Sequence, residues 1–416
     1  MLRRLMTVGL YAVACLCVSP LDAQELLSRL SMGDAVSLAL KDNPTVRAKE
    51  FERQSVSANE ITAGLRPNPT ATFSGEQFTP GGSSGAAITQ YTISIGQLIE
   101  LGGKRQRRVD SARAATKVTG FELADLQRQT TFQVKKSFTD ILLARDTLAL
   151  AQQNLTTLDE VERVQRFRAE KGDISQLELL RIQVQRFAFE RDAVDARQAL
   201  NAARITLRAL CGVDRVTEDF DVTGELTYRD MSYRHEELYR LVMRNRPDIR
   251  AAQASREKAR ADVNLARANA WWDITPQIEY QRIGPDNTIG FGVSLPLRIF
   301  DRNQGEIARA RADVLKADAT RQAVAIQALA EVDAALSTLR SEAEKVKALS
   351  ETYLPKARET RDTVDYAYRR GGVTLLDFLD AQRTYRETAL EYLRAVGNHR
   401  TAFYQLEAAV GSPLEE

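Results

Sequence analysis

Histidine and cysteine side chains, which could bind a metal or transfer protons, are scarce and widely spaced in this chain. The two histidines are His235 and His399, and Cys211 is the one cysteine outside the first 17 residues. His235-Glu236 begins like the zinc motif H-E-x-x-H, but Tyr239 occupies the place of the second histidine. We therefore predict no metal site, no cofactor and no enzyme activity.

Gly103-Lys104 looks like the end of a phosphate-binding loop, but the residues around it do not fit. The motif G-x-x-x-x-G-K-[ST] requires glycine where Leu98 stands and serine or threonine where Arg105 stands. No nucleotide site is predicted, so any energy for transport has to come from a partner. The formal net charge is only +2 at pH 7 and no long basic block stands out, which argues against nucleic acid as a partner.

The first residues have the composition of a secretion signal. Arg3 and Arg4 precede an apolar segment over residues 5–18, which is shorter than the roughly 20 residues that a membrane-spanning helix needs. We assign residues 1–23 to a signal peptide. The stretch before Cys15 loosely resembles a lipoprotein cleavage site, so lipidation of this cysteine is an alternative.

The two halves of the chain repeat one plan at an offset of about 200 residues. The matching segments are EKGDISQLELLRIQ (170–183) with RRGGVTLLDFLDAQ (369–382), KDNPTVRA (41–48) with RNRPDIRA (244–251), and ALCGV (209–213) with AAVGS (408–412). Because the matches keep the same order, they indicate an internal duplication. We expect a first repeat at 24–213, a linker at 214–234 and a second repeat at 235–416.

Each repeat contains a pair of short segments in which apolar and polar residues alternate. They lie at 70–78 and 88–98 in the first repeat and at 274–281 and 288–297 in the second. This pattern predicts two-faced strands of about the 9–11 residues that cross a bilayer in a β-barrel. Four strands cannot close such a barrel, so a bilayer location requires several chains, whereas a soluble protein would pack two hairpins on a core. Trp271 and Trp272 fit an aromatic belt at a membrane interface.

Long helical patterns follow each strand pair. One extends from residue 104 to about residue 168 and the other from residue 303 to about residue 369, which is roughly 100 Å each. Apolar residues recur at spacings typical of coiled coils. Pro355 predicts a kink or a local adjustment in the second helix. Gly172 and the Gly371-Gly372 pair predict sharp turns into a returning helix.

The duplicated plan and two short motifs together resemble the TolC family of outer-membrane factors. The motifs are ALKDNP at 39–44 and the turn pattern G-x-[IV]-[ST]-x-L-[DE] in both repeats. The stretch IELGGKR at 99–105 is a narrower match, which is similar to the cobalt-zinc-cadmium efflux branch of that family. The resemblance extends from about residue 31 to residue 411. It implies a mainly α fold with a small β part. It further implies a trimer with a shared twelve-stranded β-barrel in the outer membrane of a Gram-negative bacterium and a long α-helical barrel in the periplasm.

The resemblance also implies partners. A periplasmic membrane-fusion adaptor would join this homotrimer to an inner-membrane pump of the resistance-nodulation-division (RND) type, and outer-membrane lipid would surround the barrel. The adaptor would dock at two tips, which are Gly172, Asp173, Ile174 and Ser175 in the first repeat and Gly371, Gly372, Val373 and Thr374 in the second.

Asp377 and Asp380 match the aspartates that line the entrance of TolC-like ducts. Positions three apart share a helix face, and a threefold assembly would gather these carboxylates at one constriction. Mutual repulsion should then raise some of their pKa values, and the ring should concentrate cations. The alternative is two solvated acidic residues on a polar helix face.

Tyr368 matches a tyrosine that helps to hold the closed tip in that family. The arginine that TolC has two positions after the turn glycine is replaced here by Val373, so this latch has to be absent or built otherwise. Arg369 and Arg370 are the nearby candidates.

These expectations describe a duct rather than a catalyst. We expect the outer-membrane exit duct of a tripartite efflux system that exports heavy-metal cations. A multidrug efflux duct or a type I protein-secretion duct would have the same architecture. A soluble periplasmic coiled-coil structural protein is the alternative from another class.

Overall fold

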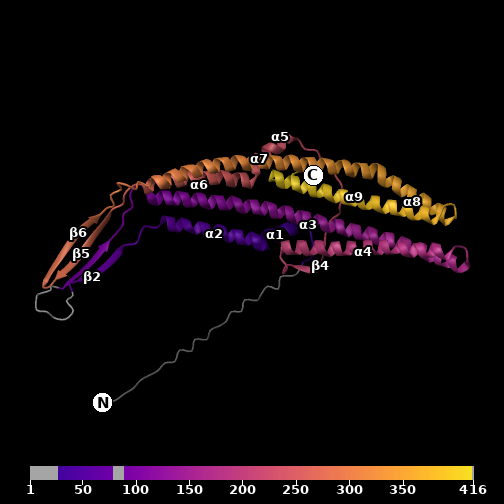
Figure 1. Ribbon diagram of the computed structural model, residues 1–416, viewed down its shortest axis with the longest axis horizontal. Helices are drawn as coiled ribbons and strands as arrows, with labels where there is room; N and C mark the ends of the chain where they lie inside the picture. The colour runs from indigo at the N-terminus through magenta and orange to yellow at the C-terminus, as the bar shows by residue number, and fades with distance from the viewer. Residues whose placement is uncertain (1–26, 78–88, 415–416) are drawn as a thin grey trace, which may run out of the picture.

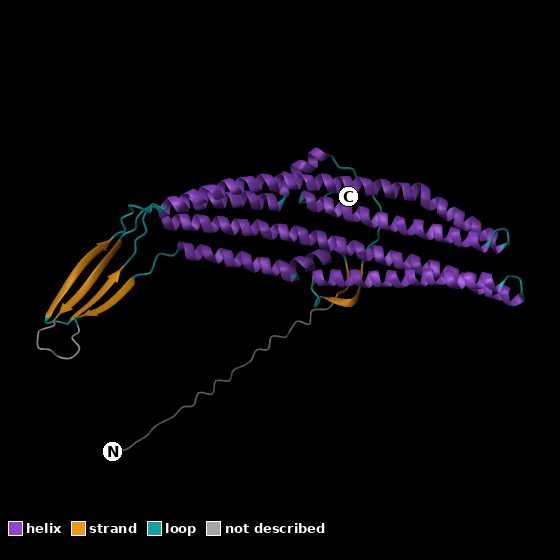
Figure 2. Cartoon of the chain, viewed as in Figure 1, coloured by secondary structure: helices purple, strands orange, loops and turns teal. Residues whose placement is uncertain are grey.

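The protein is a long array of helices with a small sheet at one end (Figure 1, Figure 2). The computed structural model describes residues 27–77 and 89–414. The predicted signal peptide, Cys15 and the predicted strand ends at 78 and 88 lie outside these ranges. Within them, no helix is both long enough and apolar enough to cross a membrane.

The two halves of the chain contain corresponding helices and strands. The first half consists of β1 (Leu27–Leu30), α1 (Met32–Asp42), α2 (Pro44–Gly64), β2 (Thr70–Glu76), β3 (Gln90–Gly96), α3 (Lys104–Lys171), α4 (Gln176–Cys211) and β4 (Val216–Val222). The second half consists of α5 (His235–Asn245), α6 (Pro247–Asn269), β5 (Thr275–Ile283), β6 (Asp286–Ser294), α7 (Gln304–Ala348), η1 (Leu349–Tyr353), α8 (Leu354–Arg369) and α9 (Leu375–Val410). The fold is mainly α with a small β part, which confirms the predicted fold class.

Strands β2, β3, β5 and β6 form one antiparallel sheet in that order. On its apolar face, Ile93 lies opposite Tyr280 and Ile95 opposite Ile278, and all four side chains are exposed. Directly opposite residues point to the same face of a sheet, so the predicted alternation produces one continuous apolar surface.

The other face of this sheet is polar and has two glycines in β6. Glu279 lies opposite Gly290, and Gln277 lies opposite Gly292. A Cβ atom at Gly290 would lie 2.7 Å from the Glu279 side chain, and one at Gly292 would lie 2.8 Å from the Gln277 side chain. The glycines therefore leave the space in which the longer polar side chains lie across β6.

The second hairpin is tighter than the predicted loop. β5 extends to Ile283 and β6 begins at Asp286, so that only Gly284 and Pro285 separate the strands. Gly284 has a φ of 58°, which glycine adopts without steric cost. The pairing therefore continues to the turn.

Strands β1 and β4 form a second sheet that the sequence did not predict. The two strands are parallel, and β4 lies inside the segment expected to be a linker, 214–234. Leu30 and Phe220, one from each strand, are both fully buried in the core. This part of the linker is therefore packed structure that pairs with the start of the described chain.

The long helix of the second half is interrupted, whereas that of the first half is continuous. α3 is continuous over 68 residues, whereas α7 and α8 are joined by η1, a π-helical turn that ends two residues before Pro355. Proline lacks the N–H that an α-helix requires and clashes with the preceding turn, and a π turn relieves both problems locally. The predicted adjustment at Pro355 is confirmed.

Each repeat has a similar apolar core near the middle of its long helices. In the first repeat this core includes Val134, Phe138 and Ile141 of α3 and Leu207 of α4. In the second it includes Val332, Leu336 and Leu339 of α7 and Phe403 and Leu406 of α9. Repeated heptad-like spacing therefore produces two equivalent packing sites in one chain.

A polar side chain in front of α2 and of α6 binds the end of the returning helix. Asn43 donates from Nδ2 to the carbonyl of Leu210 at 3.0 Å, and Arg246 donates from Nη1 to the carbonyl of Ala409 at 3.0 Å. Arg246 is only 3% exposed and also forms an ion pair with Glu331 at 2.5 Å. Because the last carbonyls of a helix lack intrahelical partners, these contacts fasten each short helix to a long hairpin.

Replacement of Arg246 with methionine should destabilise the fold by about 2 kcal/mol, because it leaves the Ala409 carbonyl and the partner carboxylates without their donor. The measurement is the thermal unfolding temperature of the purified protein, followed by circular dichroism. Arg260→Met changes an exposed arginine of the same helix that forms no hydrogen bond or ion pair with the described residues, and it should leave this temperature unchanged. Equal unfolding temperatures for the two variants would show that the capping contact is dispensable.

Candidate functional site at the helical tips

Both long hairpins turn at a glycine with a left-handed backbone. The φ angle is 80° at Gly172 and 75° at Gly371, a region that glycine enters without strain. The N–H of Gly172 donates to the carbonyl of Ala169 at 3.1 Å, and the N–H of Asp173 donates to that of Arg168 at 2.9 Å. These bonds satisfy the last carbonyls of α3. The two turns lie at the end of the molecule opposite the sheet (Figure 1).

Ser175 and Thr374 begin the returning helices α4 and α9 as N-caps. The Ser175 hydroxyl accepts from the N–H of Glu178 at 3.4 Å, and the Thr374 hydroxyl accepts from the N–H of Asp377 at 3.3 Å. The Asp377 carboxylate accepts in return from the N–H and the hydroxyl of Thr374 at 3.0 Å and 2.6 Å. The spacing [ST]-x-x-[DE] in the turn motif is therefore explained by helix initiation.

Asp377 and Asp380 are both exposed on α9, and each has a partner within the chain. Asp380 forms an ion pair with Arg383 at 2.6 Å. Hydrogen bonds from the side chain and then the backbone of Thr374 lower the pKa of Asp377 from its ordinary value of 3.8. Within one chain the cap therefore keeps Asp377 ionised. The expected repulsion among the carboxylates of three copies stays a prediction.

Tyr368 is buried inside the tip of its own chain. It is 7% exposed, and its ring stacks on Phe378 with centroids 4.8 Å apart. Burial raises the pKa of Tyr368 to about 12, and the carboxylate of Glu178 adds to the shift, so the phenol stays neutral. The core around it comprises Leu158, Val161, Ile182, Phe189 and Leu375. Both repeats therefore share one apolar core at the tips, and a latch role for Tyr368 stays a prediction.

Val373, which replaces the expected arginine, packs against this tip core. Arg369 forms an ion pair with Asp365 at 3.0 Å. The guanidinium of Arg370 lies 4.1 Å from the centroid of the Tyr366 ring. Both arginines that could replace the missing latch residue therefore have partners in their own chain.

A groove between α3 and α8 beside the tips was missed by the sequence reasoning. Its volume is about 300 Å³, and its lining includes Glu160, Arg163, Val164, Arg168, Asp365 and Arg369. Gln165 also lines it, is 3% exposed, and its Oε1 accepts no hydrogen bond among the described residues. Such an acceptor is open to a hydrogen bond from water or from a donor of another molecule. No local motif could reveal this groove, because its two sides are about 200 residues apart in the sequence.

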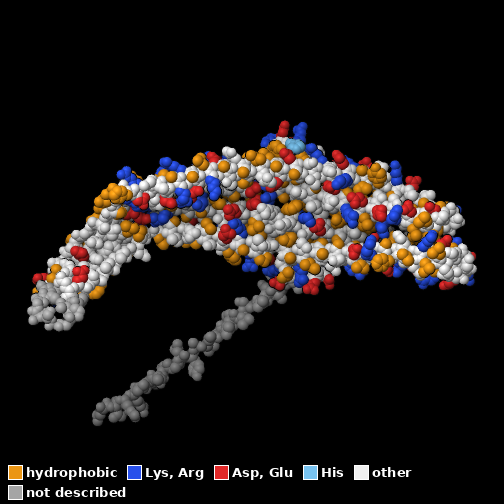
Figure 3. Space-filling model, in the orientation of Figure 1, with side chains coloured by type: hydrophobic (Ala, Val, Ile, Leu, Met, Phe, Trp, Pro, Cys, Tyr) orange, Lys and Arg blue, Asp and Glu red, His pale blue; other side chains and the backbone are white. Residues whose placement is uncertain are grey.

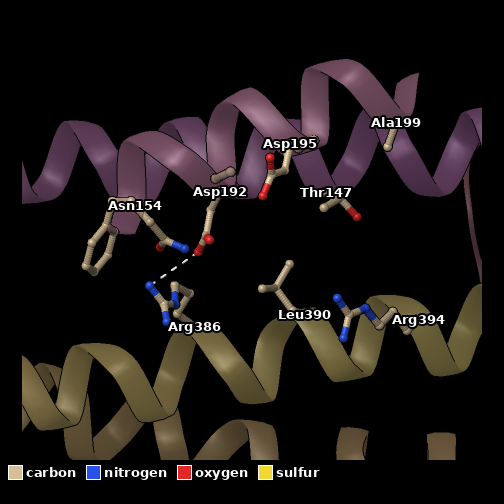
Figure 4. Close-up of a pocket in the computed structure, with 11 residues that line it drawn as sticks. Thr147, Asn154, Asp192, Asp195, Ala199, Arg386, Leu390 and Arg394 are labelled. Atoms are coloured by element: carbon tan, nitrogen blue, oxygen red, sulfur yellow. Dashed lines mark ion pairs between the residues drawn. The ribbon is translucent and has the colours of Figure 1, made fainter. Parts of the chain in front are cut away.

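A second cavity, of about 270 Å³, separates α4 from α9 farther from the tips. Asp192 of α4 and Arg386 of α9 form an ion pair across it at 3.3 Å, with Asn154 of α3 beside them (Figure 4). The guanidinium of Arg386 also lies 4.9 Å from the centroid of the Phe189 ring. The hairpin of α3 and α4 thus meets the hairpin of α8 and α9 through polar groups here and through apolar groups at the tips.

Within residues 27–77 and 89–414, no three or more histidine, cysteine, aspartate or glutamate side chains lie together as a metal site. Cys211 is buried, and burial raises the pKa of its thiol to about 12. His399 is 1% exposed, and burial lowers the pKa of its imidazole. Both side chains are therefore neutral core groups at pH 7.

The cap at Asp377 should make the start of α9 sensitive to acid. A carboxyl group whose pKa is lowered on folding stabilises the folded form above its unfolded pKa, here 3.8, and loses that effect as the pH falls through the lowered value. We therefore expect the hydrogen-exchange rate of the peptide containing residues 373–380, corrected for intrinsic rates, to increase when the pH is lowered from about 5 to about 3.

Asp377→Asn should give fast exchange of that peptide at both pH values, and Asp380→Asn should behave like the unmodified protein. Equal exchange in the two variants would contradict a capping role for Asp377.

Comparison with known proteins places this geometry in a family. The sequence profile described as outer membrane efflux protein matches residues 35–213 and 238–412. The cobalt-zinc-cadmium resistance protein CzcC of Cupriavidus metallidurans is 27% identical over 394 residues, which is 94% of this chain and 92% of that protein. Nodulation protein T of Rhizobium leguminosarum bv. trifolii is 26% identical over 87% of this chain and 81% of that protein.

Solved structures share the fold. A crystal structure of CusC matches with a TM-score of 0.78 at 18% identity, over 92% of this chain and 92% of that chain. Because the family profile covers most of both repeats, the chain belongs to the outer membrane efflux protein family and is an efflux channel of the outer membrane, not an enzyme, with its helical part in the periplasm.

Proposed function

We propose that this protein is the exit duct of a tripartite efflux system and that its cargo is heavy-metal cations. The observation that carries the cargo is the similarity to CzcC, a cobalt-zinc-cadmium resistance protein, over 94% of this chain. The entrance residues support it, because exposed carboxylates at a constriction favour cations.

Three copies would complete the barrel. β2 and β6 are the edge strands of the sheet, and unpaired strand edges are not tolerated in lipid. Pairing β6 of one copy with β2 of the next would close twelve strands, a number within the range of membrane barrels. The exposed apolar side chains of the strands would then face the hydrocarbon.

A periplasmic adaptor would dock at the tips and link the duct to an RND pump, which would supply the energy. The docking residues are the predicted ones, Gly172, Asp173, Ile174, Ser175, Gly371, Gly372, Val373 and Thr374, all exposed or half-buried at the free end of the hairpins. The groove that contains Gln165 lies beside them and offers a buried acceptor to a donor from the adaptor.

Asp377 and Asp380 would form the gate at the entrance. In three copies their six carboxylates would meet where the tips converge, and the lowered pKa of Asp377 keeps that part of the ring charged at neutral pH. Adaptor binding would move the tips apart and widen this constriction. Tyr368 would contribute by holding each tip rigid through its contact with Phe378.

Loss of the protein should make cells sensitive to metals. The test compares a deletion strain, its parent and a complemented strain across graded zinc, cadmium, cobalt, nickel and copper, beside hydrophobic drugs and bile salts. We expect reduced tolerance to one or more metals alone, restored by the unmodified protein. Sensitivity to the drugs alone would overturn the metal cargo and assign the duct to multidrug efflux, and loss of a secreted protein alone would assign it to type I secretion.

The gate predicts a charge preference that depends on both aspartates. In planar bilayers under a salt gradient, the reversal potential should report cation selectivity, and Asp377→Asn/Asp380→Asn should move the permeability ratio toward one. Asp219→Asn, which removes an exposed carboxylate of β4 far from the tips, is the matched control. An unchanged permeability ratio in the double variant would show that these residues do not determine the ion selectivity of the channel.

A further inference from the structure

Large apolar side chains are exposed where the barrel strands meet the helices. Trp271, Trp272, Leu297, Ile299 and Phe300 have 59%, 42%, 75%, 60% and 90% of their surface exposed. We call these five residues the junction collar. Figure 3 shows apolar side chains gathered at this junction, with basic side chains beside them. So much exposed aromatic and aliphatic surface at one level indicates contact with another phase or molecule.

The collar continues the apolar row of strand β6. Ile289, Phe291 and Val293 alternate along the strand and are 70%, 80% and 66% exposed. β6 ends at Ser294, but the alternation goes on through Leu295, Leu297 and Ile299. The surface suited to hydrocarbon therefore extends past the strand toward the periplasmic helices.

The tryptophan part of the collar is held in place by contacts to the start of α3 and to the residues just before it. Trp271 packs on Gly102, where an added Cβ would lie 2.9 Å from the indole side chain. The Asp273 carboxylate accepts from the N–H of Leu101 at 3.0 Å and from Nζ of Lys104 at 2.6 Å. Lys104 is 5% exposed, so this contact is shielded from water. Trp271 thus has a fixed position beside the segment that joins β3 to α3.

Two unpaired arginines lie at this junction, because the carbonyl of Pro67 accepts from the side chain of Gln97 at 2.8 Å and the side chain of Asn303 donates to the carbonyl of Ala266 at 2.7 Å. Arg66 precedes β2 and Arg302 follows β6, the two edge strands of the sheet. Both side chains are exposed, and neither guanidinium forms a hydrogen bond or ion pair with the described residues. The neighbouring carboxylate of Asp301 accepts from the N–H of Asn303 at 2.8 Å. Free cations at the same end of the sheet as the exposed rings of the collar match an anionic headgroup above hydrocarbon.

We propose that the junction collar lies in the headgroup region of the periplasmic leaflet of the outer membrane and that Arg66 and Arg302 bind anionic phospholipid there. The inference rests on the outer-membrane location and is independent of the cargo. Continuity with the lipid-facing row of β6 identifies the apolar partner as lipid, and the two unpaired guanidinium groups select anionic headgroups.

The chain carries its own reporter for this contact, because Trp271 and Trp272 are its only tryptophans. The protein is reconstituted from outer membranes into vesicles of phosphatidylcholine brominated at the 6,7 or the 11,12 position of the acyl chain. We expect the shallower bromines to quench the fluorescence more strongly. Quenching by aqueous iodide without quenching by either lipid would overturn the proposal, and so would protection from all quenchers, which would place the collar between protein chains.

Headgroup selection is tested with two vesicle preparations. One contains brominated phosphatidylglycerol and unbrominated phosphatidylcholine, and the other contains brominated phosphatidylcholine and unbrominated phosphatidylglycerol. The quenching of tryptophan fluorescence is compared between them. We expect the anionic lipid to be preferred at the collar roughly fivefold. Arg66→Gln/Arg302→Gln should reduce this preference toward one. Arg47→Gln/Arg181→Gln, which changes two exposed arginines away from the junction, should leave it unchanged. Equal effects of the two double variants would overturn the role of Arg66 and Arg302.

A second variant moves the reporter to the most exposed collar residue. W271F/W272F/F300W keeps the apolar surface and leaves one tryptophan at position 300. We expect the brominated lipids to quench the fluorescence of this variant, with the shallower bromines again more effective, as in the unmodified protein. Quenching by iodide alone would show that position 300 stands in water and would contradict the proposal.

Discussion

The backbone groups along the outer edges of β2 and β6 are the constraint on which the rest of the structure depends. In lipid each N–H or C=O without a partner costs several kcal/mol, and four strands cannot close on themselves. The sheet can therefore function only when other strands complete it, which is the physical basis of the proposed threefold assembly. The glycines opposite Glu279 and Gln277 belong to the same arrangement, because they leave room for polar side chains on the face away from lipid.

Because the chain is duplicated, its long array of helices is formed with few kinds of contact. Each repeat fastens its short helix to the end of its returning helix, but the first uses Asn43 and the second uses the buried Arg246. The equivalent carbonyl accepts a hydrogen bond from an amide in the first repeat and from a guanidinium group in the second. That guanidinium group also has two carboxylate partners. The backbone requirement is thus common to both repeats, whereas the chemistry that meets it is not.

Local patterns in the sequence predicted the parts of the structure that local physics decides. The alternation around Ile93 and Phe291 located the strands, and Pro355 located the π turn, because period and ring geometry act within a few residues. Long-range contacts were missed: β4 pairs with β1 across about 190 residues, and the groove at Gln165 is formed by two helices from different repeats. At the tips, the spacing placed Asp377 and Asp380 on one face but could not show that Thr374 caps one of them.

The packing of the tips restricts how they could open. Tyr368 and Phe378 are buried against residues of α3 and α4, and removing one such aromatic side chain from its core costs about 2 kcal/mol or more. A movement that separated the hairpin of α8 and α9 from that of α3 and α4 would expose this core as well as break the pair of Asp192 with Arg386. A movement of whole chains relative to one another would leave both contacts intact. Widening of the entrance therefore costs less when each chain moves as a unit.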